Sequence, residues 1–155
     1  MILENQVCSL EQAKKLSSFG LNKLKAYLSW YVPYYKKNKE VYRAEVALIN
    51  PHDLRVFDCE EFPAFSCAEL ALFLPEELYG RECNYRLHQF QYCEKGFIND
   101  FGLFYQSVKD EKARIPDKIL FAKHEAHVRA EMLIYLLENN IVGAEYMNRR
   151  CQFIK

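Results

Sequence analysis

The sequence predicts a single α+β domain, in which two β-hairpins form an antiparallel sheet with helices packed on one face. Three observations lead to this prediction. The length of 155 residues suits one domain. A hydrophobic content of 50% can supply its core. Helix signals and aromatic strand-like runs follow one another in the order α-β-β-α-β-β-α. We expect the domain to span residues 1–142 and residues 143–155 to form a C-terminal tail, whose docking onto the domain stays open.

The first half of the chain predicts a helix followed by a hairpin. Ser9 and Gln12 have the spacing of a capping box, and Gly20 is typical of a helix end, so we expect a helix over about residues 9–19. Strand-forming aromatic residues at 25–35 and alternating side chains at 41–49 flank a polar turn and predict a β-hairpin. Turn-forming residues at 50–53 precede a short strand predicted over 54–57.

The second half predicts the same order of elements. Ser66 and Glu69 form another capping box, and Pro75 helps to end the short helix predicted over residues 66–74. Two strand-like runs, 84–92 and 97–107, flank a turn and predict the second hairpin. A charged loop at 109–118 then leads into the longest predicted helix, about residues 121–139.

Three stretches carry a resemblance to known proteins: residues 7–16, residues 63–70 with the following Leu74 and Pro75, and residues 130–139. On these stretches the chain resembles a family of small uncharacterised proteins encoded by phages, prophages and mobile elements of gut bacteria. Those proteins usually carry alternating acidic and alanine residues before the last helix, where this chain has residues 124–129. The resemblance implies a cytoplasmic α+β protein and no catalytic residues.

Composition favours the cytoplasm as the compartment. The first residues have no basic region followed by an apolar run, so no secretory signal is predicted. The apolar runs are far shorter than the ~20 residues of a membrane-spanning helix. The 6 cysteines are too sparse for a disulfide scaffold and lack the close spacing of a zinc knuckle, so we expect free thiols.

The sequence predicts no catalytic residue, no metal site and no cofactor. His124, His127 and Glu131 have the spacing of metal-binding helices, but a helical wheel places them in the polar stripe opposite the apolar face. Cys67 lies at a predicted helix start, where a thiolate is favoured, but no signature of a partner histidine accompanies it. The 5 glycines are too widely spaced for a phosphate loop or a dinucleotide fingerprint.

The net charge of zero conceals a segregation of charge along the chain. Residues 14–43 hold 8 basic and 1 acidic residue, a balance of +7, whereas residues 44–82 hold 2 basic and 9 acidic residues, a balance of −7. The basic stretch is interleaved with tyrosines and a tryptophan. The candidate interaction surface consists of Tyr27, Trp30, Tyr34, Lys36, Lys37 and Arg43.

Two functions fit this surface. Our leading hypothesis is a non-enzymatic interaction module that binds a protein partner or a second copy of itself, because aromatic residues dominate protein interfaces and no catalytic signature is present. The alternative is an accessory protein that binds single-stranded nucleic acid, since cations beside aromatic rings contact phosphates and stacked bases. Half-buried sheet residues would explain the same aromatic content without any ligand.

Overall fold

The computed structural model describes residues 3–21, 26–37, 40–43, 47–49, 59–94, 97–143 and 145–146. Its helices are η1 (Leu3–Gln6, a 3-10 turn), α1 (Leu10–Ser18), α2 (Cys67–Phe73) and α3 (Glu125–Glu138). Its strands are β1 (Ser29–Lys37), β2 (Glu40–Arg43), β3 (Ala47–Ile49), β4 (Cys59–Pro63), β5 (Glu77–Tyr79), β6 (Asn84–Glu94), β7 (Phe97–Ser107) and β8 (Arg114–Ala122). The α+β class and the predicted order of helices and hairpins are confirmed.

Both predicted capping boxes are present. The Ser9 hydroxyl accepts a hydrogen bond from the backbone N–H of Gln12, whose side chain accepts one from the N–H of Ser9. Ser66 and Glu69 make the same reciprocal pair at the start of α2. Each box satisfies N–H groups that the first helical turn leaves unpaired. Gly20 has a φ of 91° just beyond α1, a left-handed conformation that glycine adopts without strain.

The first sheet is built around β1. Its first half pairs with β3 on one edge and β4 on the other, since Trp30 lies opposite both Leu48 and Phe62. Its second half pairs with β2, so the first predicted hairpin is confirmed. Strand β4 begins at Cys59, and the strand predicted over 54–57 lies outside the described residues.

The second sheet has the antiparallel order β5-β6-β7-β8. Strands β6 and β7 pair from Tyr85 opposite Ser107 to Glu94 opposite Phe97, which confirms the second hairpin. Strand β8 covers part of the predicted charged loop and the first residues of the predicted last helix, so α3 begins at Glu125. The sequence of β8 resembles a loop because an edge strand tolerates charged side chains and a proline.

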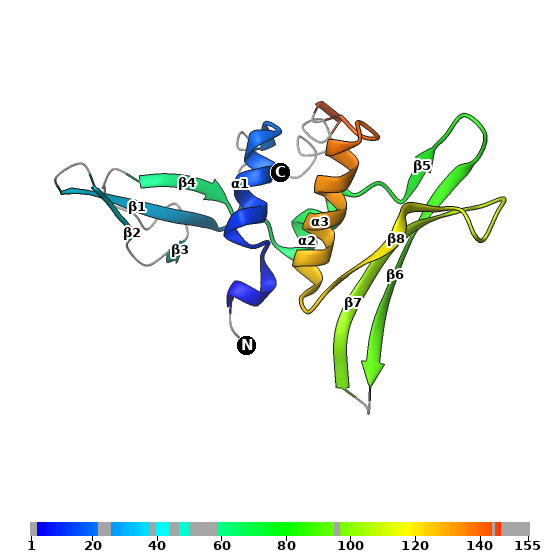
Figure 1. Ribbon diagram of the computed structural model, residues 1–155, viewed down its shortest axis with the longest axis horizontal. Helices are drawn as coiled ribbons and strands as arrows, with labels where there is room; N and C mark the ends of the chain where they lie inside the picture. Colours follow the sequence, from blue (N-terminus) through cyan, green and yellow to red (C-terminus); the bar gives the residue numbers. More distant parts are fainter. Residues whose placement is uncertain are drawn as a thin grey trace.

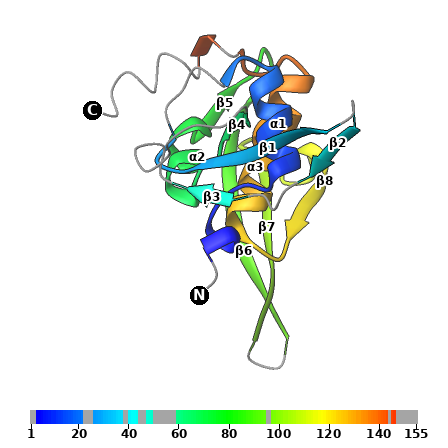
Figure 2. The same ribbon diagram turned by 90° about the vertical axis from the view of Figure 1, so that its left-hand side faces the viewer.

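The helices form a layer between the two sheets (Figures 1 and 2). Helix α1 lies against β4 and α3, and α3 lies against β7 and β8. The two hairpins therefore occupy separate sheets on opposite sides of the helices, where the sequence predicted one sheet. The first sheet packs against α1 through β4, whereas α1, α2, β7 and β8 cover α3, which is apolar around most of its circumference. Its buried residues are Ala126, Val128, Ala130, Met132, Leu133, Ile134, Leu136 and Leu137.

Helix α3 ends at a left-handed residue, Asn140, with a φ of 54°. The backbone N–H groups of Ile141 and Val142 then donate to the carbonyl of Leu136, which closes the last turn. Residues 147–155, most of the predicted tail, lie outside the described residues. In the described part of the chain, no helix has both the length and the apolar character needed to span a bilayer.

We predict that Leu133→Ala lowers the free energy of unfolding by about 2–5 kcal/mol, because it opens a cavity in the centre of the helical layer. Leu133 has no solvent exposure, whereas Val108 is 64% exposed and provides the control. Val108→Ala should change stability by less than about 0.5 kcal/mol. Urea denaturation followed by circular dichroism measures both. Equal effects of the two substitutions would contradict the central position of α3.

Candidate functional site

The structure divides the six residues of the predicted interaction surface. Tyr27 is 73% exposed, just before β1. Trp30 is only 6% exposed, and its indole Nε1–H donates to the backbone carbonyl of Cys8 at 2.9 Å. Trp30 belongs to the core because β1 is flanked by strands on both edges there and packs against the helical layer. This corrects the prediction, since a buried indole cannot stack on a ligand.

The other four residues of that surface lie on the β1–β2 hairpin. Tyr34 is paired with Arg43 across the two strands, Lys36 with Val41 and Lys37 with Glu40. The backbone thus brings Tyr34 and Arg43 opposite one another, as a hairpin surface requires. The side chains of these residues lie outside the described part of the structure.

A second group of aromatic residues lies on the side of β6, β7 and β8 that faces away from the helices. Strand residues alternate between two faces, and Leu87, Leu103 and Tyr105 belong to the helix-facing core. The alternate positions lie on the opposite face, where none is part of that core cluster. We call this surface the aromatic face and define it by His88, Phe90, Tyr92, Phe104, Arg114 and Phe121.

One row of the aromatic face is a stack centred on Phe104. The imidazole of His88, on the neighbouring strand, lies over the Phe104 ring at 5.3 Å with an angle of 15° between the planes. The guanidinium carbon of Arg114 lies 5.0 Å from the centre of the same ring. A cation over an aromatic ring is held by the ring's quadrupole. The stack therefore fixes three side chains from three strands in one arrangement.

The next row is built on Gly102. Phe90 and Phe121 lie opposite Gly102 on its two neighbouring strands, and their rings meet edge to face at 5.7 Å. A Cβ atom at Gly102 would overlap the Phe90 ring. Any larger residue at this position would therefore displace that ring, which occupies the space above the β7 backbone. Covering a strand glycine with a neighbouring aromatic ring also helps to hold the strand register.

The outer rings of the aromatic face are open to solvent, whereas Phe104 is buried beneath His88 and Arg114. Phe121 is 55% exposed and Tyr92 is 52% exposed. Arg86, beside His88 on β6, is neutralised by Glu77 at 3.0 Å. The ion pairs of the described residues do not include Arg114, whose buried Nε atom also has no hydrogen-bond partner. Arg114 is thus the cation on this face that a ligand can pair with.

The aromatic face lies outside the interaction surface that the sequence predicted. A signal was present, because His88, Phe90 and Tyr92 alternate along one predicted strand. What the sequence does not show is that β8 adds Arg114 and Phe121 to the same face, since β8 was predicted as a loop and a helix start. The face is assembled only when β7 pairs with β8.

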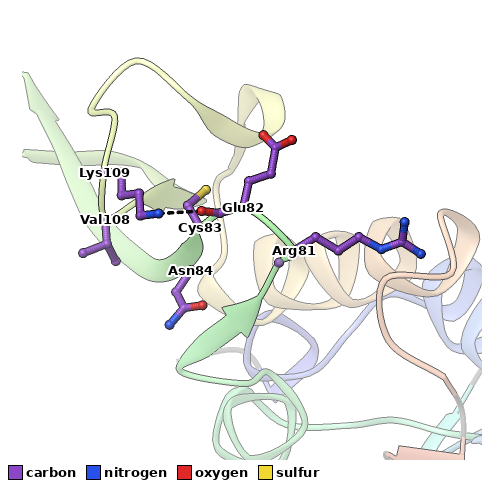
Figure 3. A pocket seen from close by; sticks show the side chains of 7 residues that line it. Arg81, Glu82, Cys83, Asn84, Val108 and Lys109 are labelled. Atoms are coloured by element: carbon purple, nitrogen blue, oxygen red, sulfur yellow. Dashed lines mark hydrogen bonds between the residues drawn. The ribbon is translucent and has the colours of Figure 1, made fainter.

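A pocket of about 330 Å³ opens between the turn that follows β5 and the residues that follow β7 (Figure 3). Lys109 donates from its Nζ to the backbone carbonyl of Glu82 at 2.7 Å, and the Ser107 hydroxyl donates to the Cys83 sulfur at 3.4 Å. Figure 3 shows the Arg81 side chain directed away from Cys83 and Lys109. The polar groups of the pocket therefore do not converge on a ligand position.

Cys67 lies at the start of α2, as predicted, but its surroundings disfavour a thiolate. Burial and a hydrogen bond with Glu125 raise the pKa of Cys67 to about 11, and nearby Arg129 only partly offsets this increase. Glu125 itself accepts hydrogen bonds from Arg129 and Gln89. Burial raises the pKa of Glu125, but these bonds outweigh it and keep the carboxylate charged. The cluster joins α2, α3 and β6 and has a structural role.

The polar stripe of α3 is the contact surface for α1. Gln12 donates to the backbone carbonyl of His127 at 3.0 Å and to the Glu131 carboxylate at 3.3 Å. Lys15 forms an ion pair with Glu138 at 2.7 Å. Among the described residues, no group of three metal-ligating side chains converges at any point. The polar stripe, which the helical wheel separated from the apolar face, thus contacts α1 while Glu131 and Glu138 stay exposed.

Comparisons with protein-family models, curated proteins and solved structures found no match. The identification of the aromatic face as a candidate site therefore rests on the geometry of this chain alone. The resemblance to phage and mobile-element proteins stays a prediction.

Gly102→Ala should lower the free energy of unfolding by about 1–3 kcal/mol, because the added methyl group overlaps the Phe90 ring. The second variant, Phe90→Ala, removes that ring. In the double variant the two effects should not add, and Gly102→Ala should then have little effect. Chemical denaturation of all four proteins measures the coupling. Strict additivity would contradict the packing of Phe90 over Gly102.

Stability should also depend on His127. Burial, and then the charge of neighbouring His124, lower the pKa of His127 below its ordinary value of 6.5, and a hydrogen bond with the backbone of Val7 opposes this only in part. The unfolded chain therefore binds a proton more readily, and stability should decrease as the pH falls from about 7 to about 5. His127→Asn should reduce this slope in urea denaturation at a series of pH values. An unchanged slope would assign the pH dependence to other groups.

Proposed function

We propose that the protein is a non-enzymatic interaction module that binds another protein through the aromatic face. The single observation that supports this most strongly is the open, ordered set of rings on β6, β7 and β8, which no layer of the described structure covers. Exposed aromatic residues beside an arginine are the residue types that dominate protein interfaces. Contiguous exposed apolar patches of this kind usually mark an interaction site.

The partner that fits this face carries an apolar side chain next to a carboxylate. Phe121 and Tyr92 provide exposed apolar area on either side of the Phe90 ring. Arg114 is the cation of the aromatic face, and it forms no ion pair with another described residue. Its guanidinium is already fixed over Phe104, so little side-chain entropy is lost when a carboxylate pairs with it.

Protein is favoured over single-stranded nucleic acid for two reasons. Nucleic-acid grooves line up several cations along the phosphate backbone, whereas Arg86 on this face is already paired with Glu77. The nucleic-acid alternative also relied on Trp30 as a stacking residue, and Trp30 is buried. Preferential binding of single-stranded nucleic acid is therefore the result that would favour the alternative function.

The test is a selection of peptides from a random library against the full chain, followed by fluorescence polarisation with the enriched peptides. We expect peptides that combine an aromatic or aliphatic residue with Asp or Glu. Phe121→Ala and Arg114→Ala should each weaken binding by about 10- to 30-fold, as expected of a central interface residue. Tyr27→Ala is the matched control, because Tyr27 is exposed but lies just before β1, outside the second sheet.

Two results would contradict the proposal. Loss of binding in Tyr27→Ala with full binding in Phe121→Ala would return the site to the hairpin that the sequence predicted. Salt-sensitive binding of a single-stranded oligothymidylate that is tighter than that of any selected peptide would favour the nucleic-acid function.

A further inference from the structure

The edge of β6 that faces away from β7 is open along the middle of the strand. Strand β5 pairs with β6 only from Asn84 to Arg86, and the Leu87 N–H donates to the Glu76 carbonyl at 2.9 Å. In the described part of the chain, no strand pairs with this edge beyond that point. Both views show β6 and β7 extending away from the helical layer (Figures 1 and 2). The side chains there are largely exposed on both faces of the ribbon.

The open segment has two structural limits. At one end, β5 and Glu76 occupy the edge as far as Leu87. At the other end, the register of β6 against β7 shifts by one residue between Tyr92 and Cys93, which interrupts the regular ladder before pairing resumes as far as Glu94. The regular open edge is therefore residues 88–92, and Phe90 lies at its centre.

The backbone groups on this edge can be assigned. In an antiparallel ladder, alternate residues direct both their N–H and their C=O to the same side. The Leu87 N–H points toward the β5 side, whereas the Asn84 carbonyl accepts from Val108 beyond β7. The N–H and C=O groups of Gln89 and Gln91 therefore point to the open edge.

Within residues 88–92, this edge lacks the side chains with which proteins prevent strands from pairing between molecules. The segment contains no Lys, Arg, Asp, Glu or Pro. Exposed edges are usually protected by such residues, and an unprotected edge is a site of strand addition. The net charge of the whole chain is zero, so two copies do not repel one another through it.

We propose that two copies of this chain associate by antiparallel pairing of residues 88–92 of β6 about a two-fold axis at Phe90. Gln89 of one copy then lies opposite Gln91 of the second copy, and each such pair exchanges both of its N–H···O bonds. Phe90 lies opposite Phe90 of the second copy, and His88 lies opposite Tyr92 of the second copy. These aromatic pairs lie on the same side of the sheet as the aromatic face.

In the dimer, the second sheet of each copy joins that of the other to form one continuous sheet. The aromatic face stays uncovered. The inference thus goes beyond the proposed function, and either can fail without the other. Because the paired edge is short, the dimer buries less accessible surface than the ~800 Å² per partner of a standard interface. We therefore expect a weak dimer, with a dissociation constant of about 10 μM to 1 mM.

Sedimentation equilibrium of the full chain over a range of concentrations tests the association. The wild type should dimerise, and Gln91→Pro should weaken dimerisation by at least about 10-fold, because proline removes an open-edge N–H and is tolerated at a strand edge. Gln91→Thr is the matched control, since threonine keeps that N–H and favours strands, and it should dimerise like the wild type. Circular dichroism confirms that both variants fold.

Disulfide trapping tests the register. Phe90→Cys in a Cys93→Ser background should form a covalent dimer under mild oxidation, because opposed residues of this kind lie about 4.5 Å apart between their Cα atoms. Arg86→Cys in the same background should not cross-link, since β5 covers that position. If Phe90→Cys does not fold, His88→Cys combined with Tyr92→Cys reports the same register.

Three results would overturn the inference. If the wild-type chain stays monomeric at about 1 mM, the β6 edge does not pair with a second copy, and a strand of another protein would be the partner of this edge. A Gln91→Pro variant that dimerises as strongly as Gln91→Thr would place the association elsewhere on the molecule. Dimerisation without cross-linking of either cysteine variant would exclude pairing about Phe90.

Discussion

The burial of α3 decides how the helices and the second sheet pack. This helix is apolar around most of its circumference, so one covering layer cannot remove it from water. Helix α1 covers the polar stripe through Gln12 and Lys15, α2 packs beside α3, and β7 with β8 covers the opposite side. The first sheet packs on α1 through β4, so the two hairpins lie on different sides of the helical layer rather than in one sheet.

The same constraint exposes the candidate site. The second sheet uses one face to cover α3, and its other face carries ordered aromatic residues without a covering layer. Phe104 and Gly102 hold the surrounding rings in place through packing within the sheet. The face is therefore preorganised before any partner binds, which reduces the entropy lost on binding.

Local signals in the sequence predicted the elements well. Ser9 with Gln12 and Ser66 with Glu69 mark helix starts by a mechanism that needs only neighbouring residues, and both capping boxes are present. Strand β8 was missed because its charged residues and Pro116 are typical of a loop, and only pairing with β7 makes it a strand. The short strand β4 also depends on β1, a partner distant in the sequence, whereas β5 pairs with the nearby β6.

The location of the site could not be predicted in the same way. Trp30 and Phe121 are both aromatic residues in strands, yet one is in the core and the other is exposed. Which face of each strand is covered depends on where α3 packs, and no local pattern encodes that. The alternation of His88, Phe90 and Tyr92 indicated two faces but not which of them meets the helices.

We propose that the aromatic face, and not the β1–β2 hairpin, binds a protein partner. Amide chemical-shift mapping by NMR, with a peptide selected against the full chain, tests it most directly. The largest shifts should fall on β6, β7 and β8 around His88, Phe104 and Phe121, and β1 and β2 should be unaffected. Shifts confined to the β1–β2 hairpin would contradict this account.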